Sequence, residues 1–256
     1  MFNAQTVTML AKETWITIYM TLTSTAMAYL IGLPMGVTLV VTAKEGLKPH
    51  PVVYKVLDFV ANIVRSVPFL ILLIMLIPFT RLIVGKSYGA TATIVPLTIA
   101  AAPFIARLVE SSLLEVDKGV VEAAQSMGAS NWNIIWKVLL AEARVSLIVN
   151  GTIALATILG YSAMSGAVGG GGLGDVAIRY GYHRYQMGIM MVTVVLLVLL
   201  VQVMQYIGTK ISKKMDKRNR KNKTPRLTRQ GVLFAFKTRG RYEKCNRCRN
   251  LSEIFN

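Results

Sequence analysis

The sequence from residue 117 to 142 reads DKGVVEAAQSMGASNWNIIWKVLLAE, a polar stretch with long apolar stretches on both sides. Asp117 can cap a first short helix, and Gly128 can supply the left-handed residue that ends it. Ser130 can cap a second helix, which continues into the apolar run VLL. This pattern predicts a helix, a turn and a helix between two membrane-spanning segments.

Small residues in the first of these helices favour a docking surface. Ala123 and Ala124 let a partner backbone approach closely, while the lone carboxylate of Glu122 fixes the register of the contact. The alternative is an amphipathic hairpin that lies on the bilayer and has no protein partner.

Composition assigns the rest of the chain to a membrane. Hydrophobic residues make up 54% of the 256 residues and charged residues 16%, against about a quarter charged in soluble domains. We therefore predict an all-α integral membrane protein with five transmembrane helices and a cytoplasmic helix-turn-helix loop. The predicted spans are residues 15–42, 69–82, 90–109, 145–160 and 187–207. Residues 53–65 have a polar face and predict an interfacial helix, and the glycine-rich residues 161–174 predict an irregular connection.

The positive charge is concentrated at one end of the chain. From Lys210 onward there are 16 basic and 3 acidic residues, a net of +13 out of the total of +17. Residues 1–217 are therefore predicted to form the membrane domain. Residues 218–256 are too basic and too polar to bury a core, which predicts a disordered tail that anionic membrane lipid could attract.

Topology follows from the odd number of spans and from the positive-inside rule. More basic side chains of the body fall on the docking-loop side than on the other side. This bias predicts an amino terminus outside the cell inner membrane, with the docking loop and the carboxyl terminus in the cytoplasm.

The body shows no reactive constellation. Its two histidines lie in separate polar connections, and no pair of carboxylates falls within the predicted membrane layer. The Gly-x-Gly-x-x-Gly of residues 169–174 does not follow a strand, which argues against nucleotide binding. A lone Cys-x-x-Cys in the tail is weak support for zinc. We expect no enzyme activity, no cofactor and no metal site.

Polar and soft side chains at the end of the fourth span predict a translocation path or gate instead. They are Tyr161, Ser162 and Met164. A polarisable methionine beside them can form an apolar wall for a thioether-bearing substrate.

Two sets of residues carry a resemblance to a known family. Glu122-Ala123-Ala124, three further residues and Gly128 resemble the coupling loop of ABC-importer permeases, although Ala141 stands where that family has proline. The stretches NIVRSVPFLILL (62–73), IPFTRLIVG (77–85), APFIARLVE (102–110) and GYSAMSGAVG (160–169) are similar to the methionine-importer permeases.

The resemblance implies a homodimeric permease that works with a cytoplasmic ABC ATPase dimer and an external methionine-binding protein. The ATPase would dock on Glu122, Ala123, Ala124 and Gly128 and would hydrolyse ATP, so this chain would have no catalytic residue. One alternative is a permease of the same architecture for another amino acid or an osmolyte. Another is a membrane anchor whose basic tail binds lipid or nucleic acid; we expect no nucleic-acid partner.

Overall fold

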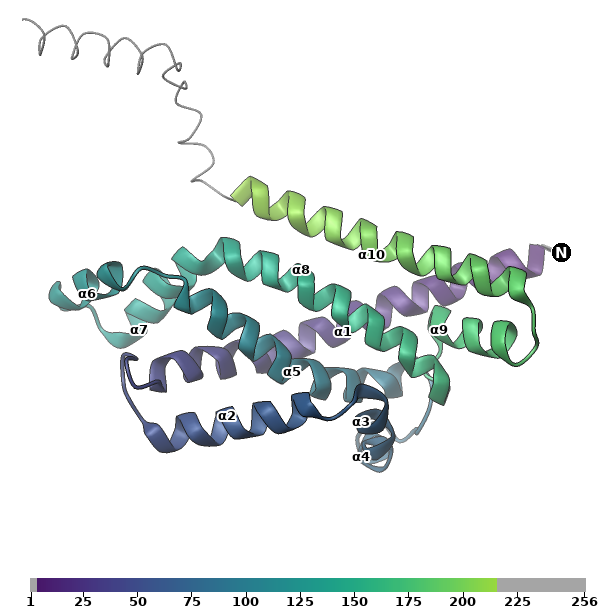
Figure 1. Cartoon of the computed structure of the whole chain (residues 1–256), viewed down its shortest axis with the longest axis horizontal. Helices are drawn as coiled ribbons and strands as arrows, with labels where there is room; N and C mark the ends of the chain where they lie inside the picture. The colour runs from purple at the N-terminus through teal and green to yellow at the C-terminus, as the bar shows by residue number, and fades with distance from the viewer. Residues whose placement is uncertain (1–3, 216–256) are drawn as a thin grey trace, which may run out of the picture. The chain divides into compact units, whose positions relative to one another are not determined.

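The computed structural model describes residues 4–215, and every regular element among them is helical. The α-helices are α1 (Ala4–Thr42), α2 (Pro51–Ser66), α3 (Phe69–Met75), α4 (Ile77–Val84), α5 (Ala90–Leu114), α6 (Lys118–Ser126), α7 (Asn131–Asn133), α8 (Leu140–Ser165), α9 (Gly172–Val176) and α10 (Met187–Met215). Shorter π- or 3₁₀-helical segments are η1 (Ile134–Leu139), η2 (Gly166–Val168) and η3 (Ala177–Tyr182). Figure 1 shows their arrangement.

The chain divides into two units, Met1–Ser212 and Lys213–Asn256. The second unit is described only as far as Met215. The predicted tail at 218–256 and its Cys-x-x-Cys lie outside the described residues, so the domain boundary at Lys217 stays a prediction.

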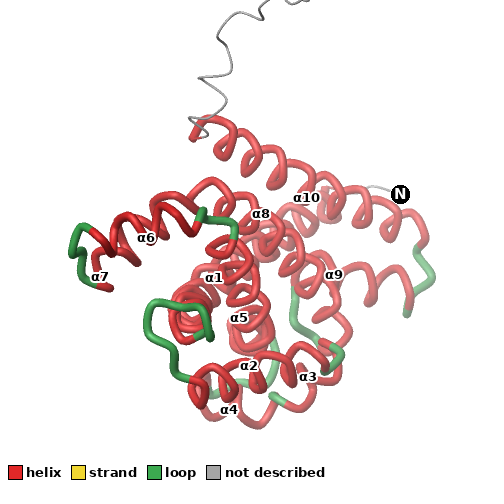
Figure 2. The backbone as a smooth tube through the Cα atoms, turned by 60° about the vertical axis from the view of Figure 1, so that its left-hand side comes forward, coloured by secondary structure: helices red, strands yellow, loops and turns green. Residues whose placement is uncertain are grey.

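Helices α1 and α5 form the centre of the first unit (Figure 2). Their backbones touch because glycines of α1 face α5. A Cβ atom on Gly32 would lie 2.7 Å from the carbonyl oxygen of Ala102, and one on Gly36 would lie 2.6 Å from that of Ala106. Such distances leave no room for a side chain, so these glycines set the spacing of the two central helices.

The core continues from this pair to α8. Ile105 and Val109 of α5 pack in one cluster with Ala154 and Ile158 of α8, all at most 1% exposed. The most apolar window of α5 is 67% buried within the chain, whereas that of α10 is only 6% buried. Most of α10 therefore presents its side chains to lipid or to another subunit.

Four helical segments are long and apolar enough to cross a membrane: α1, α5, residues 131–168 and α10. The bent pair of α2 and α3 raises this number to five, in agreement with the predicted number of spans. All four helices run beyond their predicted limits, because the helical backbone continues through polar residues at which the apolar runs end.

The predicted span at 69–82 was wrong. This stretch divides at Leu76 into α3, with 7 residues, and α4, with 8 residues, and a span requires about 20. The apolar character continues through the break, but Pro78 falls at the start of α4, where a missing backbone N–H is tolerated. A fifth span would instead combine α2 and α3, which meet at 102°.

The polar face of residues 53–65 has a partner within the chain that was not predicted, and the interfacial position of this helix stays a prediction. Helix α2 runs along α1 and α5 in the same direction as the long helices, as Figure 1 shows. Its polar face is turned to Arg107 of α5, where Asp58 and Asn62 bind that side chain. Part of the polar face of α2 therefore forms an ionic contact within the bundle.

The glycine-rich segment is more ordered than predicted. Helix α8 continues to Ser165, η2 follows, and α9 begins at Gly172. The N–H of Gly172 donates to Glu13 Oε2 at 2.8 Å, and the N–H of Leu173 donates to Thr17 Oγ1 at 2.9 Å. Two side chains of α1 thus hold the start of α9 and satisfy its otherwise unpaired amides.

Candidate docking and pathway sites

The candidate docking element is the hairpin of α6 and α7 at one end of the first unit (Figure 1). Asp117 precedes α6 and accepts the N–H of Gly119 at 2.8 Å. Gly128 follows α6 with φ +76°, in the left-handed region. Ser130 Oγ accepts the N–H of Asn133 at 3.4 Å at the start of α7. The caps and the glycine turn the chain through the helix-turn-helix geometry that the sequence indicates.

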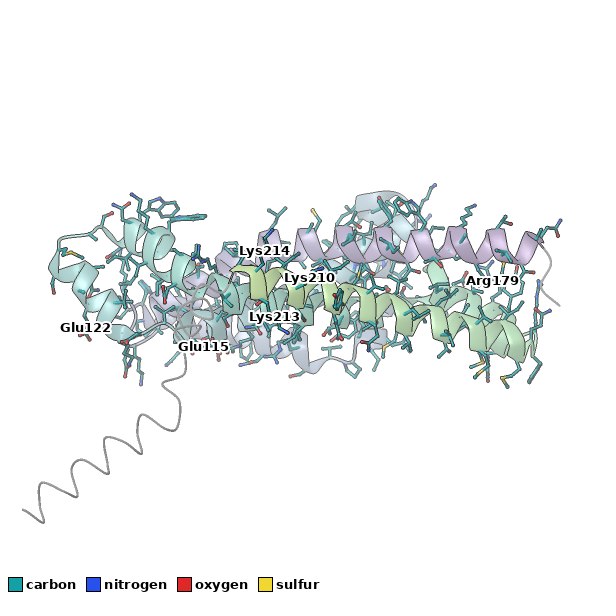
Figure 3. All side chains as sticks on the ribbon, turned by 90° about the horizontal axis from the view of Figure 1, so that it is seen from above. Glu115, Glu122, Arg179, Lys210, Lys213 and Lys214 are labelled. Carbon is teal, nitrogen blue, oxygen red and sulfur yellow. The ribbon has the colours of Figure 1, made fainter. Side chains whose placement is uncertain are left out.

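The four predicted docking residues do not share one environment. Glu122, Ala123 and Gly128 are exposed, whereas Ala124 is 5% exposed and packs into the main core cluster. Figure 3 shows Glu122 at one end of the molecule and Arg179 towards the other. Glu122 and Ala123 can therefore meet a partner, and Ala124 joins the hairpin to the bundle.

Sequence reasoning missed three apolar side chains on this hairpin and on η1, the segment that follows it. Met127, Trp132 and Trp136 are 80%, 67% and 52% exposed. The two tryptophan rings lie 5.6 Å apart, as their spacing of four residues on a helix allows. Large aromatic side chains are typical of the energetic centres of protein interfaces. The Trp-x-x-x-Trp spacing of residues 132 and 136 was the signal that could have identified the two tryptophans.

The loop between α1 and α2 supports the hairpin from one side. Glu45 and Leu47 line a pocket of about 330 Å³ together with Val121 and Leu139. Glu45 also forms an ion pair with Lys118, and the hydrogen bond and charge of Lys118 lower the pKa of Glu45 from its ordinary value. Both side chains are largely exposed, so this pair adds little to stability.

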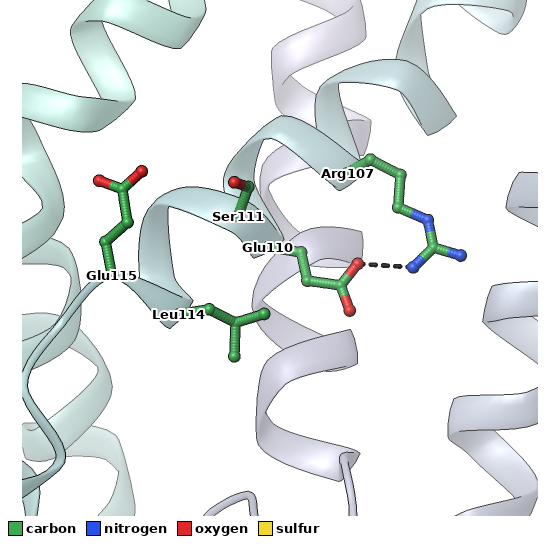
Figure 4. A pocket seen from close by; sticks show the side chains of 5 residues that line it. All are labelled: Arg107, Glu110, Ser111, Leu114 and Glu115. Atoms are coloured by element: carbon green, nitrogen blue, oxygen red, sulfur yellow. Dashed lines mark hydrogen bonds and ion pairs between the residues drawn. The ribbon is translucent and has the colours of Figure 1, made fainter.

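An ionic cluster joins α2 to α5. Arg107 donates to Glu110 Oε2 at 2.7 Å and to Asn62 Oδ1 at 3.1 Å, and it also pairs with Asp58. Figure 4 shows Arg107 and Glu110 beside an open pocket of about 410 Å³, also lined by Ser111, Leu114 and Glu115. Asp58 and Glu110 both pair with Arg107, and this cluster could not be predicted because Asp58 is distant from the other two residues in the sequence.

The candidate path residues separate into two environments. Tyr161 stacks on Phe69 of α3, with ring centroids 4.5 Å apart and an angle of 8° between the planes. Met164 is 54% exposed. Ser162 is 1% exposed, and its hydroxyl donates within α8 to the carbonyl of Leu159 at 2.8 Å. Met164 is therefore exposed in this chain, Tyr161 is half-buried against Phe69, and Ser162 packs inside.

Comparison with known proteins places this geometry in a family. Residues 28–217 match the model of the family described as "Binding-protein-dependent transport system inner membrane component". The chain belongs to this family. Its members are transport components, so the chain is a multi-pass inner-membrane permease subunit and not an enzyme. The resemblance to ABC-importer permeases is thereby confirmed.

Similar chains in this family cover most of the sequence. The "Probable D-methionine transport system permease protein MetI" of Vibrio cholerae serotype O1 is 55% identical over 82% of this chain and 93% of its own length. The D-methionine transport system permease protein MetI of Escherichia coli strain K12 is 49% identical over 62% of this chain and 73% of its own length.

A solved structure extends the similarity to the fold. A chain described under "Inward facing conformations of the MetNI methionine ABC transporter" is 46% identical and matches with a TM-score of 0.82. The match covers 83% of this chain and 99% of the other chain. The described helices therefore have the arrangement of a binding-protein-dependent permease.

Proposed function

We propose that this chain is the permease subunit of an ATP-driven ABC importer of methionine and that two copies form the translocation path. The observation that carries the proposal is the 55% identity with a MetI permease over 93% of that protein's length. The TM-score of 0.82 with a chain of a methionine ABC transporter supports the same function.

Coupling to a cytoplasmic ABC ATPase dimer would occur at the hairpin of α6 and α7. Its exposed Met127, Trp132 and Trp136 offer apolar contact area, and Glu122 offers one charge for register. The helical segment that begins at Asn131 continues to Val168 without a break. A push on the hairpin would therefore be carried along α8 to Tyr161 and Met164, which we propose as path or gate residues with Ser162 packed behind them.

The amino terminus would lie outside the cell and the carboxyl terminus in the cytoplasm. The far end of α1 leads into the loop whose Glu45 pairs with Lys118 of α6. A helix of 39 residues rises by about 58 Å, a length that supports placing Ala4 and the hairpin on opposite sides of a bilayer. An external methionine-binding protein would deliver substrate on the side of Ala4, and membrane lipid would surround α10.

Import into vesicles tests the function. The permease, its ATPase and the binding protein are reconstituted together, and uptake of labelled methionine is measured with ATP and with a non-hydrolysable analogue. We expect uptake only with ATP and with all three components present. Matched vesicles receive labelled betaine or a basic amino acid. Uptake of one of these without uptake of methionine would refute methionine as the substrate.

A further inference from the structure

The break between α2 and α3 divides the helix pair that together is long and apolar enough to form a fifth span. Helix α2 has 16 residues and rises by about 24 Å from the loop beside the docking hairpin. The hydrocarbon layer is about 30 Å thick, so a layer that begins at this loop would include Ser66, Val67 and Pro68. At these residues the chain bends by 102°.

The bend leaves polar backbone groups of α2 without partners. Among the described residues, no backbone N–H donates to the carbonyls of Val64, Arg65 or Ser66, because Pro68 has no N–H and the following residues do not reach them. Irregular backbone within a membrane is tolerated only where it is buried in protein or lines a water-filled cavity. At membrane depth, the open carbonyls at the end of α2 would therefore require water beside the break.

A pocket of about 210 Å³ lies at this place. Its lining includes Val64 and Arg65 from the end of α2, together with Phe69 of α3, Phe104 of α5 and Tyr161 of α8. Pockets for drug-sized ligands usually measure about 300 Å³ or more. This pocket is smaller, which fits one free amino acid and excludes a peptide.

The chemistry of the lining is that of an amino-acid site. Arg65 is exposed, and its side chain makes no hydrogen bond or ion pair with any described residue, so its guanidinium is open to a carboxylate. The stacked rings of Phe69 and Tyr161 offer an aromatic surface that favours a thioether sulfur. The open carbonyls of α2 accept hydrogen bonds from an ammonium group.

We propose that this pocket is a binding site for a zwitterionic α-amino acid within the translocation path, one in each copy of the chain. Arg65 binds the carboxylate, the last turn of α2 binds the ammonium group, and the Phe69–Tyr161 pair contacts the apolar side chain. The identification of that side chain as methionine's rests on the proposed function. The competing explanation is that Arg65 only compensates the helix dipole at the end of α2.

Cysteine protection tests the site directly. The reporters are Val64→Cys and Ala100→Cys, two positions of the lining, in a background of Cys245→Ser and Cys248→Ser. The permease is reconstituted with its ATPase and without binding protein, and the rate of reaction with a water-soluble maleimide is measured at increasing L-methionine. L-methioninamide, which lacks the carboxylate, and N-acetylmethionine, which lacks the ammonium group, are compared.

We expect methionine to slow the reaction at both reporters and the two analogues to protect poorly. Arg65→Gln removes a charged hydrogen-bond partner, so the concentration for half-protection should rise by about tenfold or more. Lys55→Gln removes an exposed charge from the same helix outside the pocket, and it should leave protection unchanged. Val52→Cys, which is 64% exposed and not part of the lining, should react equally with and without methionine.

Three results would overturn the site: reporters that do not react at all, reporters that methionine does not protect, or protection that survives Arg65→Gln unchanged. Import of methionine is measured in parallel with the complete system. Import without protection would reject the pocket and leave the proposed function intact. Absent import by the unsubstituted complex would reject the proposed function independently of the labelling result.

Discussion

Gly128 offers a test of the docking hairpin in which strain and bulk can be separated. Its φ is +76°, and a Cβ atom built on it would have no neighbour within 4 Å. Substitution therefore meets no clash within the chain and is opposed only by the left-handed backbone. For most L-residues that conformation costs about 1–2 kcal/mol, whereas asparagine adopts it readily.

From highest to lowest docking and coupling, the expected order is the unsubstituted Gly128, Gly128→Asn, Gly128→Ala and Gly128→Val. A cost of about 1–2 kcal/mol lowers the population of the docking-competent turn by a factor of about 5–30. Gly128→Asn should thus remain close to the unsubstituted protein, although asparagine is larger than alanine. Gly128→Val should be the most impaired, because β-branched residues are least tolerant of positive φ.

Recovery of the ATPase with the purified permease measures docking, and methionine imported per ATP hydrolysed measures coupling. Membrane abundance is determined for each variant. Gly188→Ala is the matched control, since this glycine of α10 also has open space around its Cβ position but has no positive φ. Equal impairment by asparagine and valine would show that bulk at the partner surface decides the effect, and the strain argument would then fail.

Three further predictions concern the ionic cluster, the topology and the tail. Arg107→Met leaves the carboxylates of Asp58 and Glu110 without their cation, so the apparent Tm in detergent should fall. Adding Asp58→Asn to this variant should restore part of the lost Tm. Losses of Tm that simply add for the two substitutions would contradict the coupling of α2 to α5. Cysteines at Gln5 and Ser130 should react with an impermeant reagent from opposite faces of sealed cells, and reaction of both from outside would exclude the proposed topology. Truncation after Lys217 should preserve import, because residues 218–256 are too polar to form part of the membrane domain; lost import at normal abundance would show that the tail has a role.

The features that the sequence predicted well depend on local chemistry. Asp117 and Ser130 cap helices through hydrogen bonds to residues two and three positions away, and Gly128 ends α6 with its own dihedral angles. The absence of proline after Leu140 also had the local consequence expected of alanine, since the helix continues through this position. Such features require no knowledge of the rest of the fold.

The errors arose where distant residues decide the structure. The partner of the polar face of α2 was missed because Arg107 is 49 residues away from Asp58. The contact between Glu13 and Gly172 joins residues 159 positions apart. The break at Leu76 was hidden for a different reason: α3 and α4 are both apolar, so hydropathy does not change where the helix stops.

The unbroken helical segment from Asn131 to Val168 has 38 residues, a length of about 57 Å. The π-helical turn at Ile134–Leu139 lies near its docking end. A π-helical turn holds one residue more than the α-helical turn it replaces, and one residue corresponds to about 100° of rotation around the helix axis. The extra residue therefore sets the angle around the helix axis between Trp132 and Tyr161. Converting this turn to regular α-helix would rotate the two ends of the segment relative to each other by about 100°.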